Sequence, residues 1–132
     1  MTLVVPNTSE VIIMENFLNV AVPQDLVLKL YSNNLDPDET TTVADLTELS
    51  GGGYSDVALV AGDWTVNSGG PTVATYPEIV FNFTGVAGNT YGYYVVQSVS
   101  GALLWAEQFS DAPLNVQNNG DEIRVTLRIT LE

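Results

Sequence analysis

The side chains that could do chemistry in this chain are nearly all carboxylates. The 132 residues include 16 Asp and Glu, no histidine, no cysteine and three basic residues, Lys29, Arg124 and Arg128. Without an imidazole there is no serine triad and no histidine metal ligand, and without a thiol there is no cysteine nucleophile. Carboxylate chemistry remains: acid–base hydrolysis of a glycoside, or the binding of calcium.

Glu78 and Glu107 are the candidates for a glycosidase acid and base, because both fall in strand-like segments. Such enzymes hold two carboxyl groups roughly 5–9 Å apart across a cleft. No motif in the sequence implies that arrangement, and carboxylates commonly occupy the wet face of a strand. We therefore expect that the protein is not an enzyme.

Acidic residues crowd one loop and the segment after it: Asp36, Asp38, Glu39, Asp45 and Glu48. Oxygen ligands at alternate positions can bind calcium, but Thr41 stands where an EF-hand loop requires glycine. The glycines at 51–53 lack the lysine of a phosphate-binding loop. We expect a solvated acidic loop, no bound metal and no cofactor.

Aromatic residues gather in two neighbouring strand-like segments: Tyr91, Tyr93, Tyr94, Trp105 and Phe109. An exposed aromatic face of this kind can stack sugars, whereas nucleobases are disfavoured by the acidic charge. The alternative is that the rings pack against each other across the strands, inside the core. We favour the packing interpretation and keep the binding face as the second hypothesis.

Strands must position these side chains, since apolar residues alternate with polar ones along most of the chain. The clearest case is the last segment, whose apolar residues we expect to face the core: Ile123, Val125, Leu127, Ile129 and Leu131. Further strand-like runs lie at residues 25–32, 54–60, 64–66, 72–76, 78–84, 90–98 and 102–109. About eight strands with frequent turns predict an all-β fold, an antiparallel β-sandwich of jelly-roll-like type.

The first 24 residues differ from the rest, so we divide the chain into an N-terminal arm and helix (1–24) and a sandwich domain (25–132). Val11, Met14 and Leu18 recur at helical spacing and predict a short helix over residues 8–19. Asn7 and Glu10 resemble a capping box at its start. Before it, Leu3, Val4, Val5 and Pro6 form an extended apolar arm. The arm either docks on its own domain or reaches a neighbouring subunit.

The net charge of -13 limits the partners of the protein. It repels nucleic acid and anionic membranes, so we expect neither as a partner, while docking on a basic protein surface is compatible with it. The apolar run at residues 11–22 is too short to span a bilayer. The N-terminus carries no basic segment, and we expect no signal peptide.

Several segments, in order along nearly the whole chain, resemble a family of small virion-associated structural proteins of tailed bacteriophages, including cyanophages. They are Val5-Pro6-Asn7 with the helix after it, residues 26–34 with the acidic loop, Gly53-Tyr54, and residues 91–96, 103–107 and 118–121. The resemblance implies a structural role in the virion. Its favoured version is a capsid decoration (cement) protein that binds the major capsid protein, and the alternative is a tail or fibre component that binds carbohydrate.

The decoration role implies a location on the capsid surface and, by analogy with other cement proteins, a homotrimer. The contacts that we expect to hold the protein in place lie in the arm and the helix: Leu3, Val4, Val5, Pro6, Val11, Ile12 and Phe17. An extended apolar arm of this kind can add to the sheet edge of a neighbour. The number of copies in each particle would distinguish the capsid from the tail.

Overall fold

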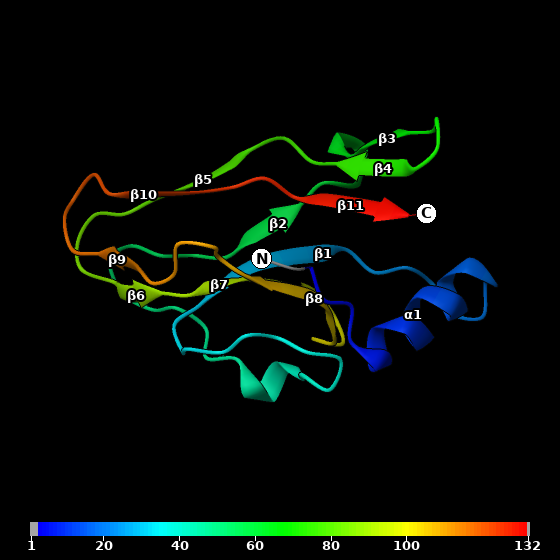
Figure 1. Ribbon diagram of the computed structural model, residues 1–132, viewed down its shortest axis with the longest axis horizontal. Coiled ribbons are helices and arrows are strands. Elements are labelled where there is room, and N and C mark those ends of the chain that lie inside the picture. The colour runs from blue at the N-terminus through cyan, green and yellow to red at the C-terminus, as the bar shows by residue number, and fades with distance from the viewer. Residues whose placement is uncertain (1–2, 132) are drawn as a thin grey trace.

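The computed structural model describes residues 3–131 and confirms an all-β protein with one short N-terminal helix, its strands paired antiparallel (Figure 1). The N-terminal half contains α1 (Asn7–Phe17), β1 (Leu26–Tyr31), η1 (Val43–Asp45), β2 (Val57–Leu59), η2 (Ala61–Asp63) and β3 (Thr65–Asn67). The C-terminal half contains β4 (Thr72–Thr75), β5 (Ile79–Asn82), β6 (Gly88–Thr90), β7 (Gly92–Gln97), β8 (Leu103–Gln108), β9 (Leu114–Val116), β10 (Glu122–Val125) and β11 (Arg128–Leu131).

The central sheet has the strand order β2-β1-β7-β8. β7 is buried along its whole length, because it pairs with β1 on one side and with β8 on the other. The strand-like runs at residues 90–98 and 102–109 contain β7 and β8, which pair antiparallel as a hairpin. Gly92 allows the closest approach in this sheet, since a Cβ there would meet the backbone oxygen of Glu107 and the ring of Tyr31.

A second layer packs over one face of the central sheet (Figure 1). Here β10 pairs with β5, and β11 with β4 and then β3, while the Tyr76 N–H donates to the Leu127 carbonyl between the two ladders at 3.1 Å. A shared core lies between the layers, built from one face of β1, β7 and β8 and from the inner residues of the second layer. Its members include Leu28, Leu30, Tyr93, Val95, Trp105, Phe81, Phe83, Ile123, Val125 and Leu127.

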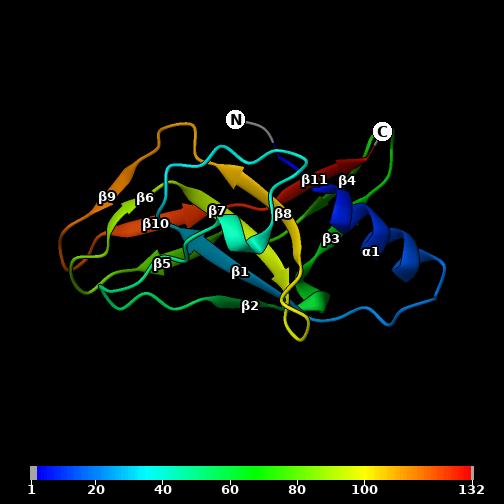
Figure 2. The ribbon, with the colours of Figure 1, turned by 90° about the horizontal axis from the view of Figure 1, so that it is seen from below.

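The other face of the central sheet is covered by the segment around η1, and α1 lies beside β8 (Figure 2). Tyr31, Tyr94 and Leu46 belong to a second buried cluster on this side. β1 is therefore covered on both faces, although its alternation predicts a strand with only one buried face. The acidic loop is solvent-exposed at Asp36, Asp38 and Glu39, as predicted, and Asp38 also accepts hydrogen bonds within the loop.

The register predicted for the last strand is correct at its start and wrong at its end. Ile123, Val125 and Leu127 are buried, and Ile129 is half-buried at the edge of the core. Leu131 is 72% exposed. It lies past the last residue that packs on the core, so alternation continues there without a layer to cover it.

The arm before α1 pairs with its own domain. Val4 forms a β-bridge with Ala106: the Val4 N–H donates to the Ala106 oxygen at 3.0 Å, and the Ala106 N–H donates back at 3.1 Å. Leu3 and Val5 pack against the main core, and Pro6 is buried. The arm thus adds to the edge of β8, so of the two alternatives left open by the sequence the structure shows docking on its own domain.

The helix begins one residue earlier than predicted and ends earlier too. Pro6 occupies the N-cap position with extended backbone angles, and no side chain caps the helix, so the predicted capping box does not form. The Asn7 N–H donates instead to the carbonyl of Glu39 at 3.1 Å. After Phe17, Asn19 has a φ of 61° in the left-handed region, which ends the helical run.

Candidate functional site

The inner side of α1 is polar where it meets the sheet. Ser9 is completely buried, and its Oγ donates to the carbonyl of Leu103 in β8 at 2.7 Å. Asn16 lies on the same side, two helical turns further on, and its buried Oδ1 has no hydrogen-bond partner among residues 3–131. Ile12 is the half-buried apolar residue between them. The helix therefore docks through a serine, an asparagine and one isoleucine.

The outer side of α1 is apolar and faces solvent. We call it the outer face of α1 and define it by four exposed side chains: Val11, Met14, Phe17 and Leu18. Phe17 is 84% exposed, an unusual state for a phenylalanine. Val20 and Val22 continue the exposed apolar sequence after the helix. An amphipathic helix normally buries its apolar side, so this one is reversed with respect to its own domain.

Carboxylates are the only charges within the helix. Glu10 is exposed and Glu15 half-buried, and no basic residue occurs in the last turn. The first basic residue along the chain is Lys29. The outer face of α1 is thus an apolar surface with acidic neighbours, on the part of the fold that projects beside β8 (Figure 2).

The structure divides the contact residues proposed from the sequence into two groups. Leu3, Val5 and Pro6 are taken up by the core, Val4 pairs with Ala106, and Ile12 points inward. Only Val11 and Phe17 are exposed. Met14 and Leu18 complete the exposed surface. Ser9 and Asn16 lie on the opposite side of the helix, and their inward direction depends on a contact with distant Leu103 that no local pattern indicates.

The aromatic residues that could have stacked a sugar lie in the interior. Tyr93, Tyr94 and Trp105 are buried and Tyr91 is half-buried, so these strands present no aromatic face to solvent. Tyr93 packs against Phe109 with ring centroids 6.3 Å apart. Burial raises the pKa of Tyr94 to about 12 and raises that of Tyr93 further. These aromatic residues therefore pack inside the core, as the packing interpretation predicts.

Glu78 and Glu107 belong to different layers and have different partners. Glu78 accepts from the Arg124 guanidinium at 2.8 Å, and Glu122 accepts from the same group at 2.7 Å. Glu107 lies in β8, where burial raises the pKa of its carboxyl while the neighbouring Tyr93 hydroxyl opposes that shift. The two carboxylates are therefore held in separate contacts, not arranged as a pair.

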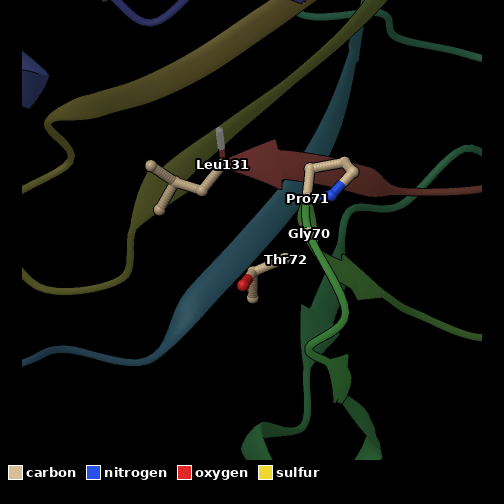
Figure 3. A pocket seen from close by; sticks show the side chains of 4 residues that line it. All are labelled: Gly70, Pro71, Thr72 and Leu131. Carbon is tan, nitrogen blue, oxygen red and sulfur yellow. The ribbon is translucent and has the colours of Figure 1, made fainter.

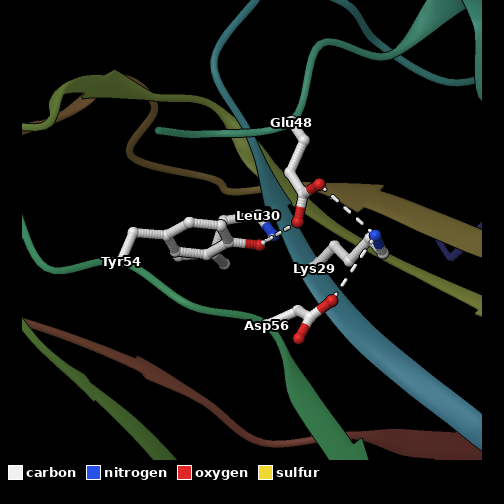
Figure 4. A network of polar contacts seen from close by, with 5 residues as sticks. All are labelled: Lys29, Leu30, Glu48, Tyr54 and Asp56. Carbon is white, nitrogen blue, oxygen red and sulfur yellow. Dashed lines mark hydrogen bonds and ion pairs between the residues drawn. The ribbon is translucent and has the colours of Figure 1, made fainter. Parts of the chain in front are cut away.

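Lys29 forms the centre of a polar network on the central sheet (Figure 4). Its ammonium lies 3.3 Å from Glu48 and 3.5 Å from Asp56. The Tyr54 hydroxyl donates to Glu48 at 2.8 Å and accepts from the Leu30 N–H at 3.2 Å. Burial raises the pKa of Tyr54, so this hydroxyl stays a donor at neutral pH. The network ties two loop segments to β1.

Within the acidic loop, the Asp38 carboxylate is satisfied by neighbouring threonines. Asp38 accepts hydrogen bonds from the Thr40 N–H at 2.8 Å and the Thr40 hydroxyl at 2.7 Å, which lowers the pKa of Asp38. Thr41, which occupies the glycine position of the failed EF-hand pattern, donates to the same carboxylate at 3.3 Å. Within the described part of the chain, no three acidic, histidine or cysteine side chains are grouped so as to hold a metal ion.

A hollow with a volume of ≈ 480 Å³ lies at the end of the sheet formed by β3, β4 and β11 (Figure 3). Gly70, Pro71, Thr72 and Leu131 line it. None of these side chains titrates near neutral pH or acts as a strong nucleophile. The lining therefore provides no acid, base or nucleophile for catalysis.

Comparison of the chain with protein-family models, with curated proteins and with solved structures finds no match. In residues 3–131, α1 is too short to cross a bilayer, and no other helix is long and apolar enough to do so. The outer face of α1 groups several exposed apolar side chains on one element, whereas the exposed apolar residues beyond position 22 are scattered singly: Val43, Val60, Val66, Val86, Val99 and Leu131.

Proposed function

We propose that the protein is a structural component of a phage virion, a capsid decoration (cement) protein that binds the major capsid protein through the outer face of α1. The observation that carries the proposal is the reversed helix, whose apolar side chains face solvent. The resemblance of the sequence to small phage virion proteins supplies the class of assembly.

The outer face of α1 supports an attachment role on energetic grounds. Full burial of a Val, Leu, Met or Phe side chain is worth about 1.5–3 kcal/mol. Met14, Phe17 and Leu18 are all more than half exposed, so most of that free energy is still available to a partner. Exposed apolar residues grouped in this way are typical of protein interaction sites.

Because the arm is paired with its own domain, we place the attachment site on the helix and not on the arm. The arm protects the edge of β8 within its own sheet. Among residues 3–131, β2 at the other edge of the central sheet and the outer strands of the second layer, β3, β5, β10 and β11, pair on one side only. Unprotected sheet edges pair readily with other chains. We propose that the homotrimer expected from the cement analogy forms through these edges, and light scattering of the purified protein measures it.

The test uses capsids of the encoding phage that lack this protein. Wild-type protein should bind them, and Met14→Ser combined with Phe17→Ser should bind at least about tenfold more weakly, because apolar burial is lost. Val60→Ser combined with Val86→Ser is the matched control, since both valines are exposed but lie in the loops before η2 and before β6. The control should bind like the wild type.

Copy number in the purified virion separates this role from its alternative. Hundreds of copies, the order expected from closed icosahedral symmetry, support the capsid, and a few to tens support a tail or fibre. Binding to a host polysaccharide without affinity for capsids would reject the decoration role. The buried positions of Tyr93, Tyr94 and Trp105 weigh against carbohydrate binding on these strands.

A further inference from the structure

We infer that the surface which receives α1 is an apolar groove rimmed by Lys or Arg side chains of a different protein, rather than a second copy of this chain. The inference rests on the proposed function and specifies the partner of the same site. It is carried by the charges that flank the outer face of α1 and by the positions of the cations of the chain.

The flanking charges have one sign. Between residues 3 and 28 the chain contains Glu10, Glu15 and Asp25 and no basic residue. Glu10 is exposed on the side of the helix that carries Met14 and Phe17, and Glu15 borders the other side next to Val11. The C-terminal end of α1, where the helix dipole favours a cation, also has no basic residue in its last turn. A complementary surface therefore supplies the positive charge.

A second copy of the helix is a poor occupant. Val11, Met14 and Leu18 have the spacing of the a and d positions of a heptad repeat, which puts Glu10 at a g position and Glu15 at the next e position. In a parallel pair, a g residue meets the following e residue of the other helix. Glu10 would then face Glu15 of the second copy, and like charges at these positions are unfavourable.

The cations of the chain do not offset this repulsion. Lys29 contacts Glu48 and Asp56, and Arg124 contacts Glu78 and Glu122. The third, Arg128, is exposed in β11, a strand of the second layer and not part of α1. With a net charge of -13, two copies also repel each other at longer range.

A membrane is an equally poor occupant. Helices that lie in a membrane interface carry Lys or Arg on their polar side, which anchors them to the head groups. α1 has Glu10 and Glu15 and buries Ser9 and Asn16 against β8. Its outer face matches a protein groove with a basic rim.

The first experiment measures binding to the same capsids at low ionic strength and at about 1 M salt, where the Debye length falls to about 3 Å. The variants are Glu10→Gln with Glu15→Gln, and Glu10→Lys with Glu15→Lys. At low salt the charge reversal should weaken binding at least about tenfold and the neutral variant less, because rim charges act mainly through long-range attraction. At high salt the variants and the wild type should converge.

Asp63→Asn combined with Asp111→Asn is the control for net charge, because these exposed carboxylates lie in η2 and in the turn after β8. It should bind like the wild type. If wild type fails to bind capsids, the proposed function fails. If Met14→Ser with Phe17→Ser loses binding while charge reversal does not, the proposed function stands and the basic rim is wrong.

The second experiment tests the other occupants with purified protein alone. Light scattering should give the same mass for wild type and for Met14→Ser with Phe17→Ser, whatever that mass is. Neither should float with phosphatidylcholine vesicles. A lower mass for the variant would assign the outer face of α1 to self-association, and flotation that depends on Phe17 would assign it to a membrane; either result overturns the inference.

Discussion

The strand formed by β10 and β11 and the helix α1 both carry regularly spaced apolar residues, and the fold uses them in opposite ways. In the strand, Ile123, Val125 and Leu127 point into the core between the two layers. In the helix, Met14 and Phe17 point to solvent, while Ser9 is fully buried. The polar residues of the strand are wet, and those of the helix are partly buried.

The difference shows that apolar periodicity defines which side of an element is apolar but not whether another layer of the protein covers that side. The second layer has the central sheet in front of it, so its apolar face is satisfied within the chain. α1 meets only the margin of the sheet at β8, where the backbone carbonyl of Leu103 needs a donor and Ser9 provides one. The helix is oriented by that polar contact, which leaves its apolar side for another molecule.

The largest effect on the buried side of this comparison should come from Leu127→Ala. Leu127 is 0% exposed, and removing a buried leucine side chain costs about 2–5 kcal/mol through lost burial and the cavity left behind. Denaturant unfolding of the purified variant measures it. Val66→Ala, at an exposed position of β3, is the control and should unfold like the wild type. If Leu127→Ala lowers the free energy of unfolding no more than the control does, the strand register is wrong.

Deletion of residues 1–6 should have the next largest effect. It removes both hydrogen bonds between Val4 and Ala106 and the packing of Leu3 and Val5, which together are worth about 2–3 kcal/mol. Circular dichroism should show a folded protein with a lower melting temperature. Unchanged stability would mean that β8 does not hold the arm. The arm would then again be a candidate for contact with a neighbouring subunit.

Ser9→Ala tests the polar contact that orients the helix. The Leu103 carbonyl would lose the donor at 2.7 Å, and a buried acceptor left without a partner costs about 1–3 kcal/mol. Thr8→Ala, at the exposed neighbouring position, is the matched control. We expect a loss of stability for Ser9→Ala alone, measured by thermal unfolding. Equal melting temperatures for the two variants would show that another contact fixes α1.

Glu107→Gln should increase the stability of the protein, by less than the preceding variants lower it, and the increase should depend on pH. Burial raises the pKa of Glu107 in the folded state, so folding favours the protonated carboxyl. That contribution is present below the unfolded pKa and is lost as the pH rises through the folded pKa. The variant should therefore be more stable than the wild type at neutral pH and equal to it in acid. A wild type that is the more stable at neutral pH would contradict this environment for Glu107.

The smallest effect on stability should come from Met14→Ala, the counterpart of Leu127→Ala. Met14 is 57% exposed, and exposed substitutions usually change the free energy of unfolding by no more than about 0.5 kcal/mol. The same denaturant experiment gives the value. A loss of 2 kcal/mol or more, on the order of a core substitution, would mean that the outer face of α1 is covered in solution.

Much of the fold could be predicted from the alternation of apolar residues. Strand β1 and the inward direction of Val125 and Leu127 follow from side chains that alternate between the two faces of a strand. The prediction failed at Leu131, because a pattern does not show where the opposite layer ends. It also failed at Asn7 and Glu10, where Pro6 and the Glu39 carbonyl begin the helix instead.

The candidate site was only partly visible in the sequence. The apolar residues of the helix and the acidic charge near them are local properties, and Val11 and Phe17 were identified from them. The direction of the helix depends on Leu103, which lies 94 residues from Ser9, and no local pattern contains that contact. The aromatic strands show the same limit, since Tyr93 and Trp105 could face either solvent or core until the second layer closed over them.

The sequence by itself determined the chemistry: no imidazole, no thiol, three cations, many carboxylates and a strand-rich chain with one short helix. Local propensities and periodicities act over a few residues, which is why they define element types and the face that each element presents. Only the tertiary structure decided that the arm pairs with Ala106, that the tyrosines are buried, and that α1 turns its apolar side outward. Those outcomes depend on contacts between distant segments, which form only when the layers pack.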